Sequence, residues 1–376
     1  MFAKIHKITD ALVGLFRRIR PNKNARRSAI KVYRRFSSLR LPLKTQKKHA
    51  KIETQVLNAL LYAAADNTSI NQVARDVVDL DPDTLMYHLR KLTVDDVAKM
   101  NQHLEQIFLE LRRSKKLPRK LRLAIDSTDY KFYGKHRNAY VIHYKSDYVF
   151  RYIMVSVVAH KVMYPLMILP VSQLSDTVEL VERLITVVKR LRIRVKAMYF
   201  DRGFYAVDIV RLLKKHKIPF VIGAEKSRGV KRILSVLTEG DTELHEFDYT
   251  MRSDRGMEDV VLYVRWNRKK EQWFTAIGWR VQTEDVRKYM HRWGIETEFR
   301  MIKEVRIKTT TRNAVIRYML VMISALICAL YAALRLGEVV MYIEAHIVLK
   351  NEEAVTLYRV RRAIKTVLDG GKNAVL

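Results

Sequence analysis

The sequence predicts an α/β fold in which a mixed β-sheet is assembled from segments far apart along the chain. Three observations lead to this prediction. Residues 1–115 show helical spacing of apolar side chains and few strand signals. From Leu121 onward, short β-branched runs alternate with amphipathic helical segments. Over residues 226–283 the helical segments stop and strand-like alternation takes their place.

The core elements are expected in a defined order. A first strand, Leu121–Asp126, precedes two adjacent antiparallel strands, Tyr148–His160 and Val162–Pro170. A helix, a strand, a helix and a final strand follow over Asp176–Leu191, Val195–Phe200, Phe204–His216 and Pro219–Gly223. The order strand, strand, strand, helix, strand, helix, strand is that of a ribonuclease-H-like fold with a mixed sheet.

This order divides the chain into four regions. A basic helical region, 1–115, precedes a core made of 116–225 and 284–340, and residues 341–376 form a helical tail without an assigned role. Residues 226–283 are predicted to be an all-β insertion into the α/β core. Its strands are expected at Glu243–Met251, Val260–Trp266 and Gln272–Trp279.

The charge of the chain points to a polyanionic partner. Lys and Arg number 71 against 39 Asp and Glu, a formal net charge of +32. No neutral metabolite requires this imbalance, whereas each nucleic-acid phosphate that Lys or Arg neutralises releases counterions. A hydrophobic content of 49% argues against a disordered basic tail. Anionic lipid is the alternative partner, and nucleic acid is favoured.

One cysteine and one apolar stretch bear on location. The single cysteine, Cys328, excludes disulfides within the chain and multi-cysteine zinc sites, and it fits a reducing cytosol. The uncharged stretch Tyr318–Leu334 is seventeen residues long. A membrane span usually needs about 20. We therefore expect a buried core helix, no membrane association, and a cytoplasmic, nucleoid-associated protein.

Residues 69–92 resemble a helix-turn-helix. Ser69 can cap a first helix, and Asp81 followed by Pro82 is a strong start signal for a second. The second helix would bury its leucines and leave four side chains facing a DNA groove. These side chains are Thr84, Tyr87, His88 and Lys91. The alternative, an ordinary helical hairpin without DNA contact, stays open.

Two acids occupy equivalent positions on strands that would be neighbours. Asp126 ends the first predicted strand and Asp201 follows the fourth, and these strands are adjacent in a ribonuclease-H-like sheet. Alone, either acid would be interpreted as a cap or turn residue. Together they predict a site for hard divalent cations such as Mg²⁺. Asp129 is a rival for the first position, but it is expected in a turn beyond the strand, so Asp126 is preferred.

A third acid, Glu296, follows the β-rich region on a predicted helix. Tyr289, Arg292, Glu296 and Lys303 fall within an arc of about 60° on that helix. An acid beside cations and a phenol suits a surface that carries a metal next to a phosphate backbone. A solvated face with an ion pair between Arg292 and Glu296 explains the same spacing, and periodicity alone does not decide between them.

The spacing Tyr289-x2-Arg292-x3-Glu296-x6-Lys303 resembles the Y-R-E-K signature of prokaryotic insertion-sequence transposases of the insertion-sequence-four superfamily. Residues 201–205, Asp-Arg-Gly-Phe-Tyr, resemble the segment around the second catalytic aspartate of that family, and Asp126 matches its first. The β-rich insertion between the second and third acids is also similar. The resemblance covers residues 121–336.

The resemblance implies a DDE transposase that nicks element ends with water and then joins the 3′-hydroxyl to target DNA. Asp126, Asp201 and Glu296 would be the catalytic acids and would bind two Mg²⁺ ions, for which Mn²⁺ can substitute. Tyr289, Arg292 and Lys303 would hold phosphates near the cleaved end. The implied partners are element terminal repeats and target DNA, with a homo-oligomer acting on paired ends.

In relatives, a tryptophan of the β insertion can stack on a flipped base during a hairpin route. Trp266, Trp273 and Trp279 are the candidates here, and the sequence selects none of them.

Two other functions also stay open. One is a ribonuclease-H-like nuclease, such as a resolvase, that cuts without joining. The other is a basic DNA-binding regulator without activity.

Overall fold

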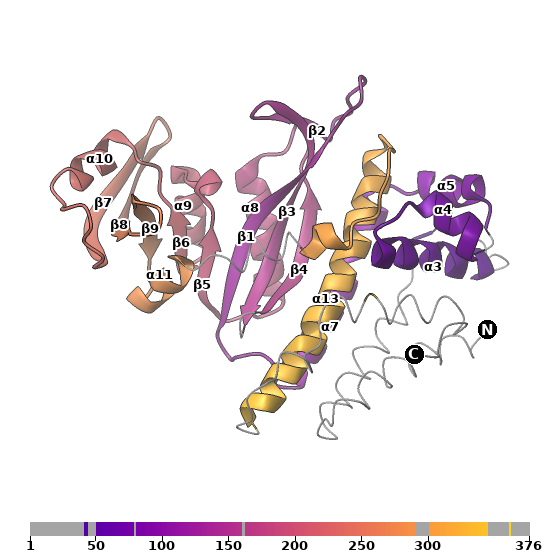
Figure 1. Cartoon of the computed structure of the whole chain (residues 1–376). Helices are drawn as coiled ribbons and strands as arrows, with labels where there is room; N and C mark the ends of the chain where they lie inside the picture. The colour runs from indigo at the N-terminus through magenta and orange to yellow at the C-terminus, as the bar shows by residue number, and fades with distance from the viewer. Residues whose placement is uncertain are drawn as a thin grey trace.

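A mixed nine-stranded sheet forms the centre of the molecule, and the predicted α/β class is confirmed. The computed structural model describes residues 41–43, 50–78, 80–159, 162–290, 301–344 and 361. In Figure 1 the helices between residues 50 and 90 lie beside one end of the sheet, and its last three strands form the other end. Most of the predicted tail, 341–376, and the basic segment 1–40 lie outside the described residues.

Each strand predicted between residues 121 and 223 is present, and a short strand, β2, joins them. The sheet order is β2-β3-β1-β5-β6-β9-β8-β7, and β4 pairs with β3 beside β2. The pairs β1–β5 and β5–β6 are parallel and the others are antiparallel. The strands are β1 Leu121–Lys131, β2 Val141–Tyr144, β3 Asp147–Ala159, β4 Val162–Pro170, β5 Val195–Phe200, β6 Phe220–Gly223, β7 His245–Ser253, β8 Gly256–Asn267 and β9 Gln272–Trp279.

The first strand is longer than the sequence predicts. It was expected to end at Asp126, but β1 continues to Lys131, which pairs with Val149 of β3. Only the parallel pairing with β5 ends near the acid, at Ile125. Because β3 supplies an antiparallel partner from Arg122 to Lys131, the strand persists beyond its apolar run. Asp129, expected in a turn, therefore lies within the strand.

Two groups of helices surround the sheet. The N-terminal group precedes β1, and its members are α3 Ala50–Asp66, α4 Ile70–Val73, the π-helical turn η2 Ala74–Val78, α5 Pro82–Arg90, α6 Val94–Ala98 and α7 Asn101–Arg113. The later helices are α8 Thr177–Arg190, η3 Arg202–Phe204, α9 Val207–Lys215, α10 Arg228–Leu234, α11 Thr283–Met290 and α13 Ala314–Glu344. Figure 1 shows α13 running between the sheet and α3–α5, and it contacts β4, α7 and α3.

The apolar helix α13 is a core element. By length and composition, Ala314–Leu336 is the one helix among the described residues that could cross a membrane, yet 89% of its apolar window is buried inside the fold. Cys328 is 1% exposed, as expected for a small buried hydrophobe. The Ser324 hydroxyl donates to the carbonyl of Val305 at 2.9 Å, which ties α13 to the segment before it. This burial is typical of the core helix of a globular protein.

The three strands predicted as an insertion continue the central sheet. β9 pairs with β6 from Phe220↔Trp279 to Gly223↔Ala276, so β7–β9 do not form a separate sheet. The expectation of an all-β segment over 226–283 was also wrong in one respect, because residues 228–234 form α10. The Ser227 side chain caps this helix by accepting from the Val230 N–H. Ser227 is thus a start signal that the sequence interpretation missed.

The helix pair within residues 69–92 has the predicted caps. Ser69 Oγ accepts from the Gln72 N–H at 3.2 Å, and Asp81 Oδ2 accepts from the Thr84 N–H at 2.9 Å. The backbone hydrogen bond from Thr84 is the main cause that lowers the pKa of Asp81. Leu89 is fully buried under the second helix. A connecting turn of π-helical geometry separates the two helices, which the sequence did not predict.

Asn101 completes the backbone hydrogen bonding of the edge strand β4. Its Nδ2 donates to the Ile168 carbonyl at 3.0 Å, and its Oδ1 accepts from the Ile168 N–H at 2.8 Å. Asn101 is 3% exposed, so water cannot readily replace it. The Tyr318 hydroxyl also donates to the Ile168 carbonyl, at 2.7 Å. One side chain therefore links α7, β4 and α13.

We predict that Asn101→Leu lowers the free energy of unfolding by about 1–3 kcal/mol. The Ile168 carbonyl keeps Tyr318 as a donor, but the buried Ile168 N–H loses its acceptor. The control is Gln106→Leu, an exposed position of the same helix, which should shift stability by less than about 0.5 kcal/mol. Urea unfolding followed by circular dichroism measures both changes, and equal stabilities would contradict the role of Asn101.

Candidate functional site

The parallel pairing of β1 and β5 brings Asp126 and Asp201 to the same edge of the sheet. The register runs through Ala124↔Tyr199 and ends at Ile125↔Phe200. Each acid is therefore the next residue after the last pair. Asp201 keeps an extended backbone, with φ −76° and ψ 175°. Since side chains alternate along extended chain, both acids lie on the face that Ala124 and Tyr199 share.

Local backbone groups orient both carboxylates. The Ser127 N–H donates to Asp126 Oδ1 at 2.7 Å, and the Gly203 N–H donates to Asp201 Oδ1 at 2.7 Å. A side chain at position 203 would crowd the second acid, because a Cβ there would lie 3.0 Å from Asp201 Oδ1. Both acids are only partly buried. The site thus presents two oriented carboxylates to solvent.

Tyr289 lies beneath the second acid. It is 2% exposed, and its hydroxyl donates to the Phe200 carbonyl at 2.7 Å, in the peptide that leads into Asp201. The ring packs against Tyr199, with the ring centroids 5.7 Å apart. A Cβ at Gly223 would approach the Tyr289 hydroxyl to 2.8 Å, so glycine leaves room for this arrangement. The phosphate contact expected of Tyr289 does not match its burial here, since its hydroxyl faces the backbone of β5.

Salt bridges dock α11 across the same face of β1 and β5. Arg122 Nε donates to Asp285 Oδ1 at 2.8 Å, and Asp285 is 1% exposed. Burial lowers the pKa of the Arg122 guanidinium, but the hydrogen bond to Asp285 and nearby charges raise it overall. Hydrogen bonds from Lys288 and Lys196 lower the pKa of Glu284 to about 2. Sequence analysis missed this cluster because Arg122 and Asp285 are 163 positions apart and match no motif.

Two members of the predicted signature lie outside the described residues: Arg292 and Glu296. Lys303 is described and exposed, and residues 301–304 around it are helical. Within the described part of the chain, no group of three His, Cys, Asp or Glu side chains is placed to hold a metal ion. The structure therefore brings together the first two acids and Tyr289, and Glu296 as a third ligand stays a prediction.

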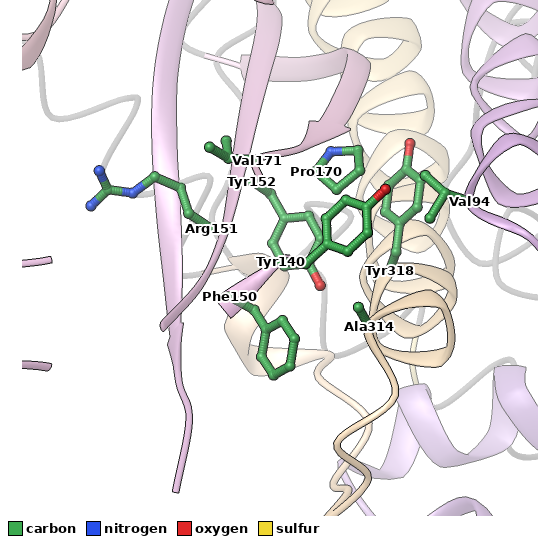
Figure 2. A pocket seen from close by; sticks show the side chains of 9 residues that line it. All are labelled: Val94, Tyr140, Phe150, Arg151, Tyr152, Pro170, Val171, Ala314 and Tyr318. Carbon is green, nitrogen blue, oxygen red and sulfur yellow. The ribbon is translucent and has the colours of Figure 1, made fainter. Parts of the chain in front are cut away.

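Asp129 has a different environment from Asp126. Its carboxylate accepts from Arg151 Nε at 2.6 Å and from Arg151 Nη2 at 2.7 Å. By strand alternation it lies on the opposite face of β1 from Asp126. Arg151, Tyr152 and Tyr318 border a small cavity of about 10 Å³, which has room for one water. Figure 2 shows that the Arg151 side chain points away from the two tyrosine rings. Asp129 is thus an ion-paired strand residue, which favours Asp126 as the site acid.

The outer face of α5 carries the side chains expected to contact DNA. Tyr87 is 56% exposed, and Lys91 Nζ lies 3.8 Å from the centre of its ring. His88 is partly buried, with its ring centroid 5.4 Å from that of Tyr87. The Thr84 hydroxyl donates to the capping Asp81 at 3.1 Å. Tyr87 and Lys91 are the most accessible of the four, and DNA contact by any of them stays a prediction.

The tryptophans of the β-rich segment pack into the sheet. Trp266 and Trp273 meet edge to face with ring centroids 5.1 Å apart, and Trp273 is 8% exposed. Trp279 stacks on Phe220 with ring centroids 6.4 Å apart, and the Arg280 guanidinium lies 4.5 Å from the centre of the Trp279 ring. Trp266 and Trp279 are only partly buried. A nucleobase can therefore reach these two rings with less repacking than Trp273 would need.

Comparison with known proteins agrees with this architecture. Residues 117–330 match the family model described as "Transposase DDE domain". Among solved structures, the piggyBac transposase in a synaptic complex with hairpin DNA is similar with a TM-score of 0.53 and 12% identity. The similarity covers 87% of this chain and 74% of that one. At this identity it concerns the fold alone. No curated protein matches the sequence.

We predict that Tyr289→Phe lowers the free energy of unfolding by about 1–3 kcal/mol, because the buried Phe200 carbonyl loses its donor. Tyr133→Phe is the matched control, since Tyr133 is 87% exposed, and it should change stability by less than about 0.5 kcal/mol. Chemical denaturation of the purified variants measures both. If Tyr289→Phe is as stable as the control, its hydroxyl does not hold β5.

Proposed function

The chain belongs to the transposase DDE domain family, and we propose that it excises and integrates an insertion-sequence element by two-metal phosphoryl transfer on DNA. The observation that carries this proposal is the β1–β5 register, which brings Asp126 and Asp201 to one sheet edge. Glu296 would complete the catalytic set. The Y-R-E-K spacing supports membership of the insertion-sequence-four superfamily.

The donor set suits hard divalent cations. Asp126 and Asp201 offer carboxylate oxygens, which Mg²⁺ prefers, and their backbone hydrogen bonds fix their orientation. These two acids and Glu296 would hold two Mg²⁺ ions, with Mn²⁺ as a substitute. Bound ions would polarise the phosphoryl oxygens and lower the pKa of the attacking water or 3′-hydroxyl.

The surrounding side chains would position the DNA and the acids. Tyr289 holds the peptide before Asp201, so it acts on the geometry of that acid. Lys303 is exposed and lines a cavity together with the first turns of α13, and it would contact a phosphate near the cleaved end. Arg292 would do the same. Such contacts place the scissile bond but do not read sequence. The strands would therefore position the acids, and the nearby cations would position the DNA beside them.

Recognition of the element ends is assigned to the N-terminal helices. The exposed face of α5, with Tyr87 and Lys91, would enter a groove, and Thr84 and His88 would flank it. The basic residues before α3 would add phosphate contacts, since residues 1–50 carry fifteen Lys and Arg and one acid. We further propose that the active form is a homo-oligomer on paired ends, located in the cytoplasm at the nucleoid.

A base flipped onto Trp266 or Trp279 would indicate a hairpin route.

We expect Asp126→Asn, Asp201→Asn and Glu296→Gln each to reduce DNA cleavage by at least about 100-fold, because each removes a carboxylate charge that the ions require. DNA affinity should stay near that of the wild type. Cleavage of a duplex that carries the element end, in Mg²⁺ or Mn²⁺, measures the loss. The matched control is Asp129→Asn, which breaks the ion pair with Arg151 but should keep cleavage within about tenfold.

Full cleavage by Asp126→Asn, or loss of cleavage only in Asp129→Asn, would refute the assignment of the first acid. The same assay separates the alternatives. Joined products between element ends and target DNA support transposition, whereas hydrolysis without joining indicates a nuclease such as a resolvase. Absence of both reactions, with intact binding, indicates a DNA-binding regulator.

We predict that Tyr87→Ala and Lys91→Ala weaken binding to element-end DNA more than binding to random duplex, with a preference loss of about 1–3 kcal/mol for a base contact. Competitive anisotropy with the two duplexes measures the difference. Lys99→Ala is the control, since Lys99 is an exposed cation on the neighbouring α6 cap whose ammonium pairs with Asp96 at 3.1 Å. Equal loss for both duplexes would show a phosphate role or none, and would contradict sequence recognition by α5.

A further inference from the structure

A cavity of about 410 Å³ lies beside the acid-bearing edge. Its walls are the end of β1, the segment 303–309 and the first turns of α13. Tyr130 lines it, and by alternation Tyr130 shares a face of β1 with Asp126. Four residues along a strand span about 13 Å. The cavity is therefore on the face of the acids, further along the same strand, and its volume is typical of a ligand pocket.

Positive charge dominates this cavity. Lys303, Arg306 and Arg317 line it, and among the described residues none of the three has a carboxylate within ion-pair distance. Asp129 is the one acid that borders the cavity, but its side chain lies on the opposite face of β1, where Arg151 holds its carboxylate. Burial is the main cause that lowers the pKa of Arg317, and the charge of Arg306 adds to it. An anion placed here would relieve that repulsion.

Tyr130, a residue of the cavity wall, has a buried hydroxyl without a partner in the described part of the chain. Tyr130 is 6% exposed. Burial raises the pKa of Tyr130, so the group stays protonated and can donate. The Arg306 guanidinium lies 6.0 Å from the centre of the same ring. A buried donor of this kind is uncommon in folded proteins, and an accepting ligand that reached it from the cavity would satisfy it.

We propose that the cavity binds a backbone phosphate of the DNA strand that crosses the acids, with Tyr130, Arg306 and Arg317 as its ligands. This inference rests on the proposed function, because it takes the DNA to lie over Asp126 and Asp201. The tyrosine hydroxyl and the guanidinium groups are all donors, which suits phosphate oxygens. The three ligands would hold the strand in register along β1 and take no part in the chemistry.

The test uses the full chain in EDTA, so that binding is measured without cleavage. A fluorescein-labelled random duplex of about 20 base pairs is titrated by anisotropy at several salt concentrations. Arg306→Gln should weaken binding and reduce the slope of log affinity against log salt by about 0.9, the value for one phosphate contact. Tyr130→Phe should weaken binding roughly tenfold, because it removes a donor to a charged acceptor.

Two control variants match these changes. Arg232→Gln removes an exposed cation from α10, which lies at the far end of the sheet in Figure 1, and Tyr263→Phe alters a buried tyrosine of β8. Both should bind as the wild type does. Arg317→Gln is a secondary variant, because Arg317 Nε also donates to the Thr311 carbonyl at 2.7 Å and its loss can perturb folding.

Thermal unfolding of the free protein separates binding from structure. Tyr130→Phe removes an unpartnered hydroxyl, so its melting temperature should equal or exceed that of the wild type while its DNA affinity falls. Wild-type affinity and slope in both Tyr130→Phe and Arg306→Gln would overturn the proposal. A second result would also overturn it. If calorimetry shows that inorganic phosphate binds the wild type but not Tyr130→Phe, while the two proteins have equal DNA affinity, the cavity takes a free anion.

The proposed function fails separately from this inference. A wild-type protein that shows the expected cavity-dependent DNA binding but neither cleaves nor joins DNA in Mg²⁺ or Mn²⁺ would retain the phosphate site and lose the transposase assignment. Conversely, active protein whose cavity variants bind and react normally would keep the transposase assignment and lose the phosphate site.

Discussion

The parallel hydrogen bonding between β1 and β5 is the constraint on which the site depends. It places Asp126 and Asp201, 75 positions apart in sequence, one residue beyond the same rung of the sheet. A slip of one residue in either strand would turn one carboxylate to the opposite face. The buried side chains of both strands resist such a slip, since Leu123, Ile125 and Phe200 are fully buried. The packing of the core therefore also fixes the positions of the two acids.

Two helices that follow the β-rich segment complete this face of the sheet. α11 is docked by the ion pair of Arg122 with the buried Asp285, and Tyr289 at its far end supports the peptide before Asp201. α13 packs on the same face further along β1, where Tyr318 stacks on Tyr152 of β3 with ring centroids 5.9 Å apart. The chain between these helices, which carries Glu296, is thus anchored at both ends on the face of the acids.

The structure also changes the interpretation of residues that motif spacing groups together. Tyr289 and Lys303 belong to one pattern, yet the first is buried under β5 and the second is exposed beside a basic cavity. Spacing along a helix gives the direction of a side chain but not what covers it. Likewise Asp126 and Asp129 are three positions apart in the sequence. The ion pair with Arg151 shows that Asp129 stabilises the pairing of β1 with β3.

By itself the sequence determined the fold class, most of the strands and helices, and the helix caps at Ser69 and Asp81, because periodicity and capping are local properties. The adjacency of the first and fourth predicted strands followed from the order of these elements. The sequence could not determine the full length of β1, the continuation of the sheet through β9, the burial of Tyr289 or the cavity around Tyr130. Each of these arises from contacts between residues distant in the chain, such as Lys131 with Val149. Only tertiary packing decides which side chains such contacts cover.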